Sequence, residues 1–154
     1  MKKIFKTRLC TLLLLTVFVS IPLGRGIRNF HEPVPAAETS LSWNLIADDV
    51  TATVYNAVPS QCNDDPVHTA SMFRLNLDNV ESHRIIAMER TMMAEYGISY
   101  GDTVLVAGTG RYDGLWQVQD TMNKRFAGQH KIDFLVPKHI RHGKWQNIKV
   151  YKRG

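Results

Sequence analysis

Hydrophobic and polar residues alternate in short runs, separated by turn-forming residues, over the C-terminal two thirds of the chain. These runs lie at residues 51–55, 103–107, 115–119, 131–136 and 147–151. Alternation with a period of two is typical of strands that bury one face, and several such strands predict an all-β barrel or sandwich. Only residues 90–96 and 137–142 look briefly helical, and neither segment is long enough to build a helical layer.

A closed barrel suits this length, because closure removes exposed sheet edges and the side chains themselves fill a small barrel. We therefore predict an all-β fold, a six-stranded β-barrel with one or two short helices. Its core would include alternating apolar residues of three strands, namely Val104, Val106, Val118, Phe134 and Val136.

The first 24 residues have a different pattern. Four basic residues precede an uncharged apolar stretch over 9–24, and Arg25 follows it. This is the pattern of a secretory signal peptide, and the stretch is shorter than the roughly 20 residues that a spanning helix prefers. We predict a signal peptide or N-terminal anchor at 1–24, a linker at 25–47 and the barrel domain at 48–154. The protein is then exported to the periplasm or cell envelope, and touches a membrane only through an uncleaved N-terminus.

The net charge of +5 belongs to this leader. Six of the 19 basic residues and none of the 14 acidic ones lie in residues 1–30, which leaves 13 basic against 14 acidic residues beyond it. Such a body has little general affinity for polynucleotides, so we expect no nucleic acid partner. Removing the leader leaves Cys62 as the single cysteine, which allows no internal disulfide. The six histidines show no metal-binding spacing, and we expect no metal or cofactor.

Three carboxylates stand out because they end or interrupt apolar strand segments. Asp120 ends one predicted strand, Asp133 interrupts the run at 131–136, and Glu89 follows an apolar segment. A charge in such a place must be paired, hydrogen-bonded or functional, because unpaired burial costs several kcal/mol. If the three converge, repulsion and desolvation would raise at least one pKa and create a general acid. Strand-end capping and pairing with arginines explain the same residues equally well.

Six short motifs occur in an order that resembles a known family. They are residues 51–55 (TATVY), 68–71 (HTAS), 84–89 (RIIAME), 100–104 (YGDTV), 119–121 (QDT) and 131–134 (KIDF). Together they resemble the three-aspartate (3D) domain over roughly residues 50–152. That domain is a double-psi β-barrel related to MltA-type lytic transglycosylases, and more distantly to RlpA and the expansins.

The resemblance implies an enzyme that cleaves the β-1,4 bond between N-acetylmuramic acid and N-acetylglucosamine in peptidoglycan glycan strands, leaving a 1,6-anhydro product. The family's three aspartates fall on Glu89, Asp120 and Asp133, and its conserved threonine falls on Thr69. The resemblance assigns the acid and base role to Asp133. Two features depart from the family pattern: glutamate replaces the first aspartate, and the loop over 121–128 lacks a double glycine.

Aromatic residues are further candidates, because a flat ring can stack on a sugar. Tyr112 and Trp116 are predicted to bind substrate in this way, although core packing is the alternative for both. The basic stretch at 138–153 is either a solvated face or a patch that attracts anionic wall polymers. We expect a monomer. The main alternative function is a non-catalytic barrel that binds cell-wall glycan or a remodelling partner, and an expansin-like wall-loosening protein ranks last.

Overall fold

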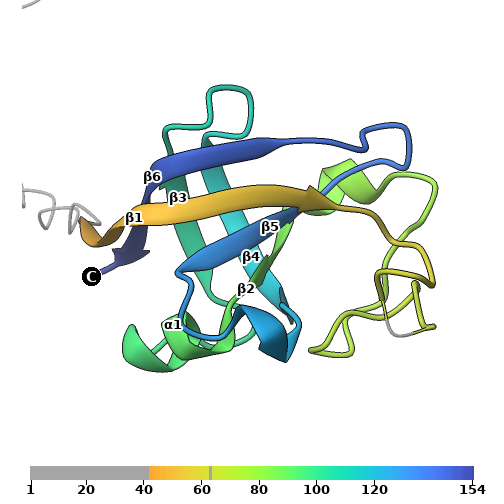
Figure 1. The fold of residues 1–154 in the computed structure, drawn as a ribbon, viewed down its shortest axis with the longest axis horizontal. Helices are drawn as coiled ribbons and strands as arrows, with labels where there is room; N and C mark the ends of the chain where they lie inside the picture. The colour runs from red at the N-terminus through yellow and green to blue at the C-terminus, as the bar shows by residue number, and fades with distance from the viewer. Residues whose placement is uncertain (1–41, 63) are drawn as a thin grey trace, which may run out of the picture. The chain divides into compact units, whose positions relative to one another are not determined.

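The computed structural model describes residues 42–62 and 64–154, which form a six-stranded β-barrel (Figure 1). The strands are β1 (Trp43–Tyr55), β2 (Ile85–Met88), β3 (Thr103–Ala107), β4 (Gly114–Thr121), β5 (Lys131–Leu135) and β6 (Lys144–Arg153). One α-helix, α1 (Arg90–Glu95), and two 3-10 turns, η1 (Val80–His83) and η2 (Lys124–Phe126), complete the described elements. Residues 137–142 do not form the expected second helix.

The barrel closes in the order β1-β5-β2-β4-β3-β6. Two pairs are parallel, β1 with β5 and β2 with β4, and the other four pairs are antiparallel. Strand β5 lies between β1 and β2, and β2 lies between β4 and β5, so the β1–β2 and β4–β5 connections each bypass one strand. These two interlocked connections are the double-psi arrangement. The predicted all-β, six-stranded barrel with a short helix is therefore confirmed.

The barrel interior is packed with apolar side chains. All five residues predicted for the core are buried there, as the period-two alternation requires. An aromatic group fills the middle: the rings of Tyr112 and Phe134 stack with centroids 5.1 Å apart, and Trp116 lies 4.6 Å from Phe134. Trp145 packs edge-on against Tyr112 at 5.3 Å. Large aromatic rings from three strands and a turn thus fill the middle of the barrel.

A second apolar cluster covers the outside of the barrel wall. The long connection between β1 and β2, on the right in Figure 1, contributes Ala57, Leu75 and Val80 to it. They pack on outward-facing strand residues and on one residue that follows β4, namely Tyr55, Ile85, Ala87, Leu135 and Met122. This outer layer is the surface on which the candidate site is built.

Strand β1 begins earlier than predicted. Trp43 pairs with Arg153 and Asn44 with Lys152, so residues 43–47 of the predicted linker belong to the barrel. The reason is tertiary, because β6 supplies a partner for a segment that has little strand pattern of its own. The predicted signal peptide and most of the linker lie outside the described residues. In the part that the structure describes, no helix has the length and apolar character needed to span a membrane.

Candidate functional site

Asp120 and Asp133 lie on strands that flank the same residue of β2. Ala87 pairs with Asp133 of β5 on one side and with Asp120 of β4 on the other. Laterally paired residues point to the same face of a sheet, so both carboxylates lie on the outer face of the barrel wall. The charge on Asp120 helps to raise the pKa of Asp133. The structure therefore brings two of the three predicted carboxylates together.

Asp133 is a carboxyl group whose pKa is raised toward neutral pH. Its side chain is partly buried, and Thr53 Oγ1 donates a hydrogen bond to its Oδ1 from the paired position on β1. Burial raises the pKa of Asp133 to about 6, and Asp120 adds to the rise while the Lys131 ammonium opposes it. A carboxyl group with such a pKa carries its proton in about half of the molecules at pH 6 and in about a tenth at pH 7.

Asp120 is held as a fixed acceptor by three donors. Its Oδ1 accepts from the backbone N–H of Thr121 at 2.8 Å and of Ala70 at 3.1 Å, and its Oδ2 accepts from Tyr55 Oη at 3.1 Å. Burial, and then the Asp120 charge, raise the pKa of Tyr55 well above its usual value, so the phenol remains a donor. Asp120 is thus oriented by β1 and by the β1–β2 connection.

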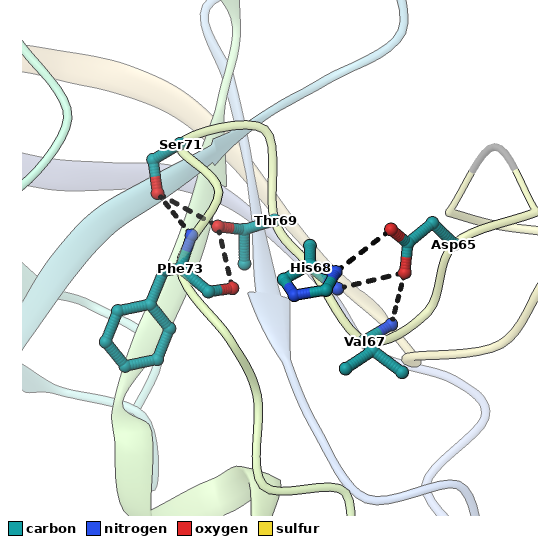
Figure 2. Close-up of polar contacts among 6 residues, drawn as sticks. All are labelled: Asp65, Val67, His68, Thr69, Ser71 and Phe73. Atoms are coloured by element: carbon teal, nitrogen blue, oxygen red, sulfur yellow. Dashed lines mark hydrogen bonds and ion pairs between the residues drawn. The ribbon is translucent and has the colours of Figure 1, made fainter.

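Thr69 lies in the turn that brings Ala70 to Asp120, and Figure 2 shows its contacts with Ser71 and Phe73. Its side chain is buried, its Oγ1 lies 3.0 Å from Ser71 Oγ, and its backbone N–H donates to Phe73 O at 3.1 Å. Ser71 Oγ in turn donates to Gln119 Oε1 at 2.5 Å, which ties the turn to the residue before Asp120. Thr69 therefore helps to hold the turn whose backbone N–H at Ala70 contacts Asp120.

The segment that leads into this turn carries a polar pair, the exposed Asp65 and the half-buried His68. Asp65 Oδ2 lies 3.0 Å from His68 Nδ1, and the other carboxylate oxygen accepts from the backbone N–H groups of Val67 and His68 (Figure 2). The hydrogen bond from His68 and the backbone donors lower the pKa of Asp65. These contacts hold residues 65–68, which precede the turn whose Ala70 N–H donates to Asp120.

Glu89, the third predicted carboxylate, has a structural task. It is almost fully buried at the N-terminus of α1, and its carboxylate accepts from the backbone N–H of Thr91 at 2.7 Å and of Met92 at 3.0 Å. Burial alone would raise the pKa of Glu89, but these donors outweigh it and lower the pKa. The carboxylate that caps its own helix is ionised and occupied, and its bonds do not join it to Asp120 or Asp133.

The two aromatic residues predicted to bind sugar lack the exposure that stacking needs. Tyr112 is 3% exposed and Trp116 is 2% exposed. Trp116 Nε1 donates to Tyr112 O at 2.7 Å, and the Arg84 guanidinium covers the Trp116 ring at 3.9 Å from its centroid. Core packing, the alternative for both residues, accounts for their positions.

Two residues of the site, Thr53 and Tyr55, were not predicted from the sequence. Both lie in the 51–55 segment and differ by two positions, so the alternation places them on one face of β1. The signal was therefore present, but their partners are 80 and 65 residues away and come from the register of β1 with β5 and the path of the β1–β2 connection.

Comparisons with protein-family models and with curated proteins find no match for this chain. Within residues 42–62 and 64–154, no three His, Cys, Asp or Glu side chains are grouped so that they could hold a metal ion. The candidate site is built from the Asp120 and Asp133 carboxyl groups and the donors that contact them, namely the Thr53 and Tyr55 hydroxyls and two backbone N–H groups.

Proposed function

We propose that this protein acts on peptidoglycan, and that it cleaves the N-acetylmuramic acid to N-acetylglucosamine bond as a lytic transglycosylase does. The observation that carries the proposal is the partly buried Asp133, whose pKa is raised to about 6, beside the hydrogen-bonded Asp120. The double-psi barrel and the resemblance of its motifs to the three-aspartate domain support the same class of substrate. A signal peptide or anchor of the predicted kind would direct the domain to the cell envelope.

In this reaction one carboxyl group works twice. Asp133 gives its proton to the glycosidic oxygen, and the bond from that oxygen to C1 of the muramoyl unit breaks. The 6-hydroxyl oxygen of the same unit bonds to C1, and its proton passes to the Asp133 carboxylate, which restores the acid. No water is consumed. A pKa near the working pH suits a group that must act as acid and then as base.

The neighbouring residues have supporting roles in this proposal. The Thr53 hydroxyl orients the Asp133 carboxyl through Oδ1. Asp120 adds to the rise that burial causes in the pKa of Asp133, and it offers a fixed acceptor to a sugar hydroxyl. The turn at Thr69 and Tyr55 hold Asp120 in place. Glu89 supports the fold of α1 and takes no part in the chemistry.

The alternative is a barrel that binds wall glycan without cleaving it. It is favoured by one observation: the third carboxylate is used as a helix cap and the two predicted stacking rings are buried, so the site has fewer contacts for a sugar than the sequence suggested. In that case Asp120 and Asp133 are ligand contacts only.

Digestion of purified sacculi distinguishes the two functions. The full chain is compared with Asp133→Asn and with Asp48→Asn, a matched change at an exposed carboxylate of β1, and released muropeptides are read by mass spectrometry. We expect 1,6-anhydro products from the wild type and Asp48→Asn, and none from Asp133→Asn. Full activity of Asp133→Asn would overturn the assignment, and sacculus binding without release by any variant would establish the binding module. A truncation at residue 48 is unsuitable, because it removes the start of β1.

A further inference from the structure

The connection between β5 and β6, together with the first residue of β6, carries a concentration of basic side chains. Lys138, His139, Arg141, His142 and Lys144 lie within seven positions, and all five are exposed. No acidic residue occurs from 134 to the end of the sequence. The ion pairs formed among the described residues use other basic groups, namely His68, Arg111 and His130. Among the described residues, no carboxylate forms an ion pair with the basic side chains of this connection.

Asn56 holds this connection in a defined conformation. Its buried side chain lies directly after β1, and its Nδ2 donates to the carbonyl oxygens of Val136 at 3.1 Å, Pro137 at 3.0 Å and Ile140 at 3.1 Å. A buried amide with three backbone acceptors fixes both sides of the turn that carries Lys138 and Arg141. The two charges are thus presented from an ordered framework, which lowers the entropy cost of binding a ligand.

Lys138 and Arg141 line a hollow of about 360 Å³ together with Asn56, Val58 and Gln61. Gln61 Oε1 accepts from the backbone N–H of Asn56 at 2.9 Å, which leaves its amide NH2 to donate to a ligand. The lining therefore combines two cations, an amide donor and one apolar side chain, and it includes no carboxylate.

A neighbouring hollow shows the contrast. It measures about 550 Å³ and shares Lys138 with the smaller hollow, but Asp78 and Glu81 are among the residues that line it. An anion there would face two carboxylates, so the smaller hollow is the one that suits a negative charge.

We propose that the hollow at Lys138 and Arg141 binds a carboxylate of the short peptide that peptidoglycan carries on its muramoyl units. This inference rests on the proposed function and deepens it. The planar guanidinium of arginine matches a carboxylate in two-point contact, and lysine adds a point charge. Val58 gives an apolar contact for a peptide side chain. The hollow is also linked to the carboxylate pair through the chain: Asn56 lines it, and the preceding residue, Tyr55, donates its hydroxyl hydrogen bond to Asp120.

The test compares binding of the full chain to two insoluble probes, sacculi with intact peptides and glycan strands from which an amidase has removed the peptides. The variant is Lys138→Gln with Arg141→Gln. Its control is Lys149→Gln with Arg153→Gln, which removes the same charge from exposed positions of β6. We expect the first pair to weaken binding to intact sacculi by about tenfold, the size of one or two charge-assisted contacts, and to leave binding to stripped strands unchanged. The control pair should change neither.

Equal losses in both variant pairs would overturn the inference in favour of general charge attraction, and so would equal binding of the wild type to both probes. Calorimetry with the free tetrapeptide, and with inorganic phosphate as a second anion, makes the result independent of catalysis. Peptide binding that only the Lys138 and Arg141 pair abolishes supports the inference even if no 1,6-anhydro product is ever released. Preference for phosphate over the peptide would contradict it.

Discussion

Asp133→Asn should stabilise the folded protein at neutral and alkaline pH, although it removes the proposed acid. Burial and the neighbouring Asp120 raise the pKa of Asp133 from 3.8 to about 6. A carboxyl group with a raised folded-state pKa binds its proton more tightly in the folded state than in the unfolded one. Its effect on stability is therefore most favourable below the unfolded-state pKa, and is lost as the pH rises through about 6.

The magnitude follows from the size of this shift. A difference of about two pKa units, at ~1.4 kcal/mol for each, makes ionised Asp133 cost roughly 2 to 3 kcal/mol of unfolding free energy above the folded-state pKa. Asparagine has the same shape, is never charged and keeps an oxygen that accepts from Thr53. We therefore expect Asp133→Asn to be more stable than the wild type by about this amount near pH 8, and by much less near pH 4.

Asp120→Asn is the matched comparison, because the same chemical change should have the opposite effect. Both Asp120 oxygens accept hydrogen bonds, two from the backbone N–H groups of Ala70 and Thr121 and one from Tyr55 Oη. An amide has a single oxygen, so one end must lose its donor, at a cost of about 1 to 2 kcal/mol. Urea unfolding followed by tryptophan fluorescence at both pH values measures all three proteins. A difference between Asp133→Asn and the wild type that does not change with pH would refute the reasoning.

Three further changes have expected outcomes. Asn56→Ala leaves three backbone carbonyls without their donor and should lower the unfolding free energy by about 2 to 4 kcal/mol in urea denaturation, with Asn56→Asp losing nearly as much. Glu89→Ala should cost about 1 kcal/mol of stability and lower the melting temperature, while muropeptide release at a permissive temperature stays intact; loss of release would restore a chemical role. The hydrogen bond of His130 to the Asp49 carboxylate raises the pKa of His130, burial opposes this rise, and the hydrogen bond to Glu95 adds to it. The stability that His130 contributes is thus present below its unfolded pKa and lost as the pH rises through the folded value, so His130→Gln should flatten the thermal stability profile in that range, and an unchanged profile would disprove the link.

The barrel could be predicted because its strands carry their own signal. Val104 and Val106 alternate with less buried neighbours, and Asp133 interrupts an apolar run in a way that marks a special carboxyl group. The start of β1 could not be predicted in the same way. Residues 43–47 contain adjacent apolar and polar residues without alternation, and they form a strand because β6 pairs with them. Propensity gives way there to a long-range partner.

The site could be predicted only in part, for reasons that differ between residues. Asp120 and Asp133 meet because each pairs with Ala87, which the sequence cannot show. Glu89 was expected to join them, but the next residues form α1 and their N–H groups capture its carboxylate. Glutamate is not among the residues that usually cap helices, so the residue type did not indicate a capping role for Glu89. Tyr112 lies near a turn as predicted, yet its ring folds inward onto Phe134 because the barrel interior offers more buried contact than solvent.

The most direct test of the central claim is digestion of sacculi by the full chain in water enriched in heavy oxygen. If the muramoyl 6-hydroxyl closes the ring and gives its proton to Asp133, the released muropeptides carry the 1,6-anhydro ring. They are then lighter by one water than hydrolysis products and contain no heavy oxygen. The release should fall as the pH rises above about 6, when Asp133 loses its proton. Products that contain heavy oxygen at the new reducing end would contradict this account, because they would show that water, and not the muramoyl hydroxyl, attacks the bond.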